Sequence, residues 1–247
     1  MDNTKEQIIR SAANILPEVI RIRRHLHMHP ELSYRENATS AFIKNYLDNL
    51  GIEHLSGIAG TGIVGIIRGT HHGKGKTIGL RADMDALPVT EVEGREYGSR
   101  SEGVMHACGH DSHVAMLLGA ATILHNIKSE FGGTILLVFQ PGEEKAPGGA
   151  KLMIDSGVFD RFKPDLFLAQ HVLPELPSGS IGYRGGPYMA SCDEIYITVK
   201  GRGGHAAQPS SYTDQIYIAS DLVMTLKDSV SKIAEEKAPT VFAIGNI

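Results

Sequence analysis

The spacing of apolar residues predicts two helices at the start of the chain. Apolar side chains recur three and four residues apart from Ile8 to Leu26, which is the period of an amphipathic helix. Pro30 follows, and because a proline disfavours helical geometry in the residue before it, we expect this long helix to end there. A second pattern of the same kind covers residues 37–50, where Gly51 supplies the left-handed residue that commonly ends a helix.

Short apolar runs then alternate with helical patterns. The run from Val114 to Leu124 is apolar on nearly all sides, which is typical of a buried helix, and residues 149–154 form a shorter helical pattern. The strand patterns are continuous or β-branched, as in the buried strands of a parallel sheet. They cover residues 62–67, 77–82, 134–139 and 166–169. This alternation predicts an α/β protein with three α/β/α layers and a mostly parallel central sheet.

The pattern changes character after Ser191. Residues 194–200 alternate between apolar and polar side chains, which indicates a half-exposed strand, and a glycine-rich loop follows. A helix is expected at residues 214–232 and another strand at residues 240–247. We therefore place a domain boundary near Tyr188, with a larger domain at residues 1–188 and the first half of a smaller α+β domain at residues 189–247.

Composition excludes several classes of function. The chain has 247 residues, 42% of them hydrophobic and 21% charged, which is ordinary for a soluble globular protein. A formal net charge of −4 provides neither a basic face for nucleic acid nor a polybasic patch for a membrane surface. No apolar run approaches the ~20 residues that cross a bilayer, and no apolar signal opens the chain. We therefore expect a cytoplasmic protein, in which reducing conditions leave Cys108 free as a ligand.

Candidate chemistry concentrates in residues 106–113. This stretch holds three imidazoles, one thiol and one carboxylate, and imidazole and thiolate are preferred ligands of borderline and soft divalent metals. Gly109 allows a sharp bend, so Cys108 and His110 can converge on one ion. The alternative is a polar helix N-terminus with solvated histidines. We favour metal binding, because surface composition rarely gathers so many ligand types.

Three of the predicted strands end at chemically active side chains. These are Asp83, the adjacent pair Glu143 and Glu144, and His171. Sites in open α/β sheets form beyond the carboxyl ends of the strands, so we expect these groups at one edge. Neighbouring side chains of an extended segment point in opposite directions, so one glutamate can bind metal while the other faces a substrate. A lone glutamate pair is more typical of an exposed loop, but here the set suits a two-metal hydrolase with a spare carboxylate for proton transfer.

Six motifs in order resemble a known family. They are the segment 24–36 with His29-Pro30-Glu31-Leu32, then Arg81-Ala82-Asp83-Met84-Asp85-Ala86-Leu87-Pro88, His106-Ala107-Cys108-Gly109-His110-Asp111, Gln140-Pro141-Gly142-Glu143-Glu144, Gln170-His171, and Gly203-Gly204-His205-Ala206-Ala207-Gln208-Pro209. The chain resembles the metal-dependent amidohydrolases of the aminoacylase and carboxypeptidase group of dinuclear metallopeptidases. That group includes hippurate hydrolases, auxin-conjugate hydrolases and N-acetyl-diaminopimelate deacetylases.

The resemblance implies a role for each matching residue. Cys108, His110, Glu144 and His171 are expected to bind divalent metal, two ions per site, with manganese, zinc, cobalt and nickel all chemically admissible. Glu143 is the expected general base on a metal-bound water.

Two further residues are expected to act around this set. Asp83 is expected to orient a ligand, the alternative being a helix or turn cap. His205 matches the histidine that, in dimeric relatives, reaches the partner's active site from the lid domain. Its alternative is a loop histidine bound to backbone. We accordingly expect a homodimer, with residues 1–188 as the catalytic domain and residues 189–247 as part of the lid and dimerisation domain.

The implied activity is hydrolysis of the amide bond of small N-acyl amino acids. A dipeptidase or carboxypeptidase with the same metal site is an alternative, and so is a non-catalytic metal-binding remnant. Two departures from the family pattern stand out. Ser210 occupies a position where relatives often have histidine, and relatives continue well beyond residue 247, with a further histidine ligand. We therefore expect the chain to be a C-terminally truncated fragment.

Overall fold

The computed structural model describes residues 2–73, 75–236, 240–245 and 247. It divides into two compact units, residues 1–184 and residues 185–247, which are described separately below.

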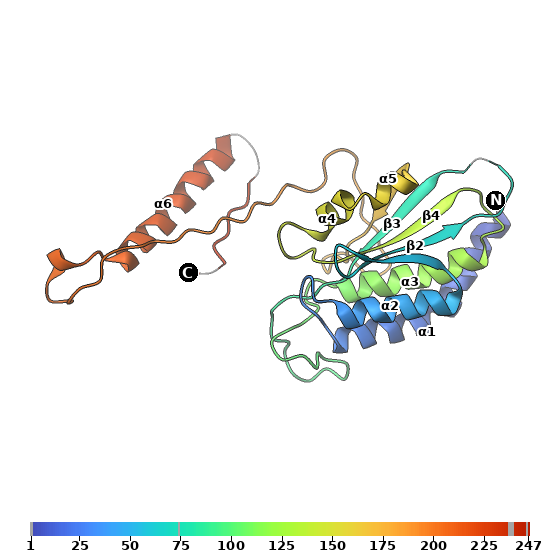
Figure 1. The fold of residues 1–247 in the computed structure, drawn as a ribbon, viewed down its shortest axis with the longest axis horizontal. Coiled ribbons are helices and arrows are strands. Elements are labelled where there is room, and N and C mark those ends of the chain that lie inside the picture. Colours follow the sequence, from blue (N-terminus) through green and yellow to red (C-terminus); the bar gives the residue numbers. More distant parts are fainter. Residues whose placement is uncertain (1, 74, 237–239, 246) are drawn as a thin grey trace. The chain divides into compact units, whose positions relative to one another are not determined.

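The first unit contains five helices and five strands among its described residues (Figure 1). In chain order they are α1 (Asp2–Met28), α2 (Asn37–Leu50), β1 (Glu53–Ile58), β2 (Gly62–Arg68), β3 (Thr77–Asp83), α3 (His110–Asn126), β4 (Thr134–Gln140), α4 (Gly149–Asp155), α5 (Val158–Phe162) and β5 (Leu166–Ala169). The predicted ends of α1 and α2 are confirmed, and Gly51 ends α2 in the left-handed conformation, at φ 68°.

The strands form one mixed sheet in the order β1-β2-β4-β3-β5. β2 is antiparallel to both of its neighbours, whereas β3 is parallel to β4 and to β5. β2 therefore runs opposite to the other strands, and the mostly parallel α/β sheet predicted from the sequence is confirmed. The register pairs Asp83 with Gln140, so the ends of β3 and β4 lie side by side.

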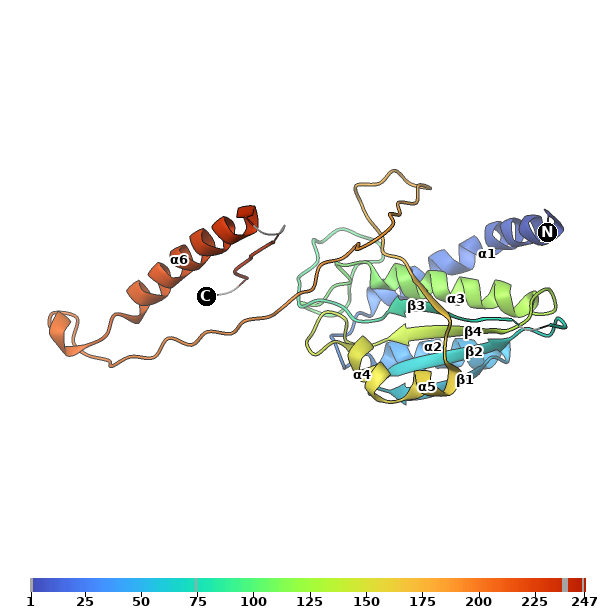
Figure 2. The ribbon, with the colours of Figure 1, turned by 90° about the horizontal axis from the view of Figure 1, so that it is seen from above.

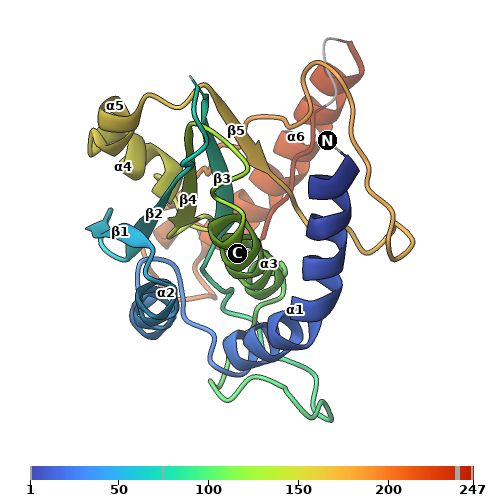
Figure 3. The ribbon, with the colours of Figure 1, turned by 90° about the vertical axis from the view of Figure 1, so that its right-hand side faces the viewer.

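Helices cover both faces of the sheet, which gives the predicted three layers (Figures 2 and 3). α1, α2 and α3 pack on one face, where Ile63 and Phe139 join their apolar residues in the larger core. α4 and α5 lie over the other face, against Val64 and Val138. Successive residues of a strand point to opposite faces, so β2 and β4 contribute to both cores.

Three local features of this unit differ from the expectation. β5 forms as predicted, but all four of its residues are exposed rather than buried, because it is an edge strand that pairs only with β3 in the described chain. β1 was not predicted, since Glu53–Ile58 has no β-branched run, and the five residues of α5 are too few to show a helical period.

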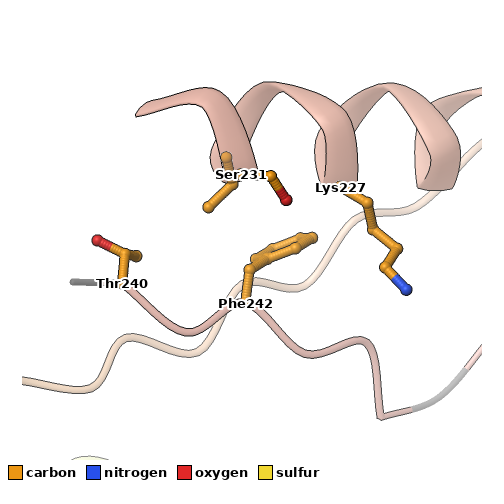
Figure 4. A pocket seen from close by; sticks show the side chains of 5 residues that line it. Lys227, Ser231, Thr240 and Phe242 are labelled. Atoms are coloured by element: carbon orange, nitrogen blue, oxygen red, sulfur yellow. The ribbon is translucent and has the colours of Figure 1, made fainter. Parts of the chain in front are cut away.

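The second unit contains η1 (Pro209–Ser211) and α6 (Gln215–Glu236), and the helix prediction for this region is confirmed. The strands predicted at residues 194–200 and 240–247 were wrong for the described residues, which form no strand there. A strand needs a partner to satisfy its backbone, and the described residues of this unit provide none. A small pocket lies instead between α6 and the segment from Thr240, where the ring of Phe242 faces the helix near Ser231 and Lys227 (Figure 4).

Among the described residues, no helix is long and apolar enough to cross a membrane.

Candidate metal centre

The carboxyl ends of β3, β4 and β5 deliver the chemically active side chains of the first unit. Asp83 is the last residue of β3, Glu143 and Glu144 follow β4, and His171 comes two residues after β5. α3 begins at His110, directly after Gly109, whose φ of 88° is a conformation that side-chain-bearing residues rarely adopt. This glycine turns the chain sharply between Cys108 and His110, as the sequence predicted.

His171 presents its Nε2 atom to Cys108. The Nδ1 atom of His171 lies 2.7 Å from the carbonyl oxygen of Val172, and because a carbonyl only accepts, Nδ1 carries the proton. With the proton on Nδ1, Nε2 presents its lone pair to Cys108 and accepts a hydrogen bond from the thiol, whose sulfur lies 3.2 Å away. Orientation of a ligating histidine by a backbone carbonyl is common at metal sites.

His110 is oriented in the same way. Its Nδ1–H donates to the backbone carbonyl of Asp85 at 2.9 Å, which leaves Nε2 without a proton in the neutral ring. This Nε2 atom faces three carboxylates, with Oδ2 of Asp83 at 3.5 Å, Oε1 of Glu144 at 3.8 Å and Oε2 of Glu143 at 3.9 Å. His110 is fully buried, and neither its Nε2 nor the Oε1 of Glu144 has a hydrogen-bond partner within the described chain.

These donor atoms fit a divalent cation. Two donors that bind one tetrahedral ion at about 2.1 Å lie roughly 3.4 Å apart, close to the separations above. The donor atoms of Cys108, His110 and His171 all lie within 4.8 Å of one another, and so do those of His110, Glu143 and Glu144. Buried polar atoms are nearly always satisfied, so the unpartnered nitrogen and oxygen call for a further group between them. The residues predicted as ligands are thus brought together, with His110 common to both sets.

The electrostatics of the site also favour a cation. Burial raises the pKa of the Cys108 thiol to about 12, and the negative charges of Glu144, Glu143 and Asp83 add to this effect. A coordinated cation reverses that tendency, because a ligating thiol is deprotonated. Burial, followed by the charges of Glu144 and Asp83, also raises the pKa of the Glu143 carboxyl.

Asp83 is buried and bound on both sides. Its Oδ1 accepts a hydrogen bond from Nδ1–H of His113 at 2.6 Å, and Arg81 lies 2.7 Å from its Oδ2. Burial alone would raise the pKa of Asp83, but the His113 hydrogen bond and the Arg81 charge outweigh it and lower the pKa. Asp83 therefore stands in the site as a carboxylate, and its expected role in orienting a ligand stays a prediction.

Asp85 is a site residue to which sequence reasoning gave no role. Its Oδ2 accepts hydrogen bonds from the Ser33 hydroxyl at 2.6 Å and from the backbone N–H of Glu144 at 2.9 Å. Burial would raise the pKa of Asp85, but hydrogen bonds from His110, Ser33 and the backbone lower it to about 2. Its position two residues after Asp83, on the same side of an extended segment, was the available signal.

His113 was also left without a role, although it lies in the histidine-rich stretch. Asp83, His110 and His113 form a third close group of possible ligand atoms, and all three are buried. Both nitrogens of His113 are however occupied, Nδ1 by Asp83 and Nε2 by the backbone N–H of Val172 at 3.0 Å. His113 therefore has no free nitrogen for a metal ion, and it instead links Asp83 to the backbone of Val172.

His205 belongs to the second unit. It is exposed, and its Nδ1 accepts a hydrogen bond from the backbone N–H of Ala207 at 3.1 Å. That contact is the backbone-bound loop histidine named above as the alternative, and its expected catalytic role stays a prediction.

The fold and the site together define an α/β protein with a histidine, cysteine and carboxylate centre at the strand ends. Residues 79–245 match the pattern of the peptidase family M20/M25/M40, and the chain belongs to this family.

Relatives and solved structures agree with this assignment. The chain is 40% identical over 241 residues to N-acyl-L-amino acid amidohydrolase of Geobacillus stearothermophilus, covering 98% of this chain and 64% of the relative. It is 44% identical over 231 residues to thermostable carboxypeptidase 2 of Saccharolobus solfataricus, covering 93% and 58%. Among solved structures, the YXEP protein of Bacillus subtilis, described as a dinuclear metal binding peptidase of the M20 family, matches with a TM-score of 0.65 and 39% identity. That match covers 69% of this chain and 47% of the YXEP chain. The chain thus spans 58–64% of the length of the curated relatives named here.

Proposed function

We propose that this chain carries the metal centre of an amidohydrolase that hydrolyses the amide bond of N-acyl amino acids. The observation that carries the proposal is the convergence of Cys108, His110, Glu144 and His171, with Nδ1 of each ligating histidine bound to a backbone carbonyl so that Nε2 faces the site. The likeness to an N-acyl-L-amino acid amidohydrolase supports the substrate class.

Each residue has a part in this chemistry. The four convergent side chains would hold the divalent ions, which would make a water molecule more acidic and polarise the substrate carbonyl. Glu143 takes a proton from the attacking water and delivers it to the amine nitrogen as the carbon–nitrogen bond breaks. Its raised pKa suits this work, since a general base serves best when its pKa approaches the working pH.

A dimer and a cytoplasmic location belong to the same proposal. His205 would reach the substrate of a second copy of the chain, and its exposed loop position is compatible with that role. A reducing compartment suits the Cys108 thiol, which is unpaired in the structure and needed as a ligand.

Hydrolysis of peptides with the same site is the second candidate. It is favoured by the likeness to a carboxypeptidase. N-acetyl-amino acids, N-benzoyl-amino acids and dipeptides, offered in parallel to the zinc- or manganese-loaded chain, separate the two candidates by their relative kcat/KM values. Preference for the acyl-amino acids supports the first candidate, and preference for dipeptides supports the second.

The test of the chemistry is the substitution Glu143→Gln in the 247-residue chain. We expect the metal content to remain and turnover to be abolished, because the ligands are intact and the proton carrier is gone. Glu175→Gln is the matched control, since Glu175 is exposed and lies in no metal-ligand group within the described chain. Retained turnover in Glu143→Gln contradicts the assigned role, and a metal-loaded wild-type chain that hydrolyses none of these substrates supports the non-catalytic remnant instead.

A further inference from the structure

His171, one of the proposed metal ligands, lies in a segment with few contacts that fix its position. It follows the edge strand β5, whose four residues are all exposed, and its own side chain is exposed as well. Its Nδ1–H is bound only to the carbonyl of the next residue, Val172. An edge strand in this setting does not by itself fix the position of a ligand to the fraction of an ångström that a metal centre requires.

We propose that His113, on the buried side of α3, is the positioning residue that holds the His171 loop and aims the His171 ring at Cys108. The proposal rests on the proposed metal centre, because it concerns one of its ligands.

The first support is a hydrogen-bond relay from the core to the loop. The backbone N–H of Val172 donates to Nε2 of His113 at 3.0 Å, so Nε2 carries no proton. Nδ1 must then carry it, and Nδ1–H donates to Oδ1 of Asp83 at 2.6 Å. Asp83 is itself fixed by Arg81 at 2.7 Å and is fully buried. The relay therefore links the peptide that follows His171 to the end of β3.

The second support is direct packing. The rings of His113 and His171 form an edge-to-face contact, with centroids 4.7 Å apart and planes at 71°. Val172 packs so closely on the turn before α3 that a Cβ on Gly109 would lie 2.4 Å from its Cγ2 atom. The same residue that receives the relay thus also contacts the turn between Cys108 and His110.

Few other contacts of the described chain could fix the position of the His171 loop. At the end of β5, Gln170 donates to the sulfur of Met116 at 3.2 Å, but a thioether is a weak acceptor. His113 is itself 2% exposed, so the surrounding core fixes the position of its ring, and the ring can in turn restrain the His171 loop. A neutral imidazole, with one donor and one acceptor, satisfies both Asp83 and Val172 at once.

The test uses three variants of the full chain with zinc as the probe. His113→Phe keeps a planar ring but removes both hydrogen bonds, His113→Gln keeps one donor and one acceptor, and His125→Phe makes the same change at the other end of α3. Loss of a group that supports a metal ligand typically lowers metal affinity by about 10–100-fold. We expect a loss of this size in His113→Phe, partial recovery in His113→Gln, and unchanged affinity in His125→Phe.

Amide hydrogen exchange at Val172 in the metal-free chain provides a readout that does not depend on metal. The Val172 N–H should be protected in the wild type, exposed in His113→Phe and protected in His125→Phe. Nitrogen NMR of the metal-free wild type should show His113 with its proton on Nδ1, which requires no variant to fold.

The possible outcomes separate the two proposals. Fast exchange at Val172 in the wild type, or a proton on Nε2 of His113, overturns the positioning role. Unchanged zinc affinity in a folded His113→Phe variant overturns it too. A wild-type chain that binds no zinc but shows the protected amide and the Nδ1 proton contradicts the proposed metal centre while supporting the relay.

Discussion

Replacing Gly109 by alanine should destabilise the protein in two separable ways. The φ of 88° places this residue in the left-handed region, where a side chain costs about 1–2 kcal/mol. The new Cβ would also lie 2.4 Å from Cγ2 of Val172, well inside normal carbon contact. Relieving such overpacking costs typically about 1–3 kcal/mol, so the free energy of unfolding should fall by roughly 2–5 kcal/mol in total.

Gly51→Ala is the matched control for the conformational part. Gly51 has a φ of 68°, and its added Cβ meets nothing within 4 Å. Only the cost of about 1–2 kcal/mol applies there, so Gly109→Ala should be the less stable variant by about 1–3 kcal/mol. For a domain of this size that difference is roughly 2–12 °C in the unfolding midpoint.

The assay is thermal unfolding of both metal-free variants by circular dichroism, together with zinc affinity measured against a competing chelator. Because Val172 must move in Gly109→Ala, and His171 precedes it, zinc affinity should fall in that variant and not in Gly51→Ala. Equal midpoints and equal affinities in the two variants would refute the close contact between the Gly109 turn and the His171 loop.

Three further predictions address the core and the site. Phe139→Ala should lower the free energy of unfolding by about 3–5 kcal/mol, because Phe139 is fully buried in the larger core. The same truncation at Ile154, which is 63% exposed, should cost much less in the same denaturant titration, and equal costs would contradict the described core. Asp85→Asn should weaken zinc binding about 10–100-fold, because Asp85 accepts a hydrogen bond from the backbone of Glu144. Asp155→Asn, at an exposed side chain of α4, should leave the affinity unchanged. Zinc at 100 times its dissociation constant should stabilise the folded chain by about 2.7 kcal/mol, and a chelator should reverse this in a thermal melt; an unfolding midpoint that zinc does not change would contradict a metal site formed by folding.

Much of the fold could be predicted because the spacing of apolar residues and the helix-ending glycine are features of short stretches of sequence. α1 and α2 repeat their apolar residues at helical spacing over several turns, and α3 is a long apolar run. Gly51 marks the end of α2 because glycine readily adopts the left-handed conformation found there. The strands β2, β3 and β4 are continuous apolar runs, which follow from burial between two layers of helices. Because β3 and β4 are parallel neighbours, Asp83 at the end of β3 and Glu144 after β4 lie at the same edge of the sheet. The turn before α3 brings Cys108 and His110 to this edge.

The remaining features depend on tertiary context. β5 has an apolar sequence typical of a buried strand, but burial depends on what covers the strand, and nothing in Leu166–Ala169 encodes that. Residues 194–200 alternate as a strand does, yet alternation does not create the partner strand that a ladder requires. The role of His113 could not be predicted for a different reason. Its Nε2 accepts a hydrogen bond from the backbone N–H of Val172, which lies 59 residues further along the chain.

Zinc-edge X-ray absorption of the zinc-loaded chain tests the central claim most directly. The account predicts a sulfur scatterer at about 2.3 Å beside nitrogen and oxygen scatterers at about 2.0–2.2 Å. The sulfur signal should disappear in Cys108→Ala and remain in Cys192→Ala, which removes the exposed cysteine of the second unit. A wild-type spectrum with no sulfur, or a sulfur signal that survives in Cys108→Ala, would contradict the metal centre described for this chain.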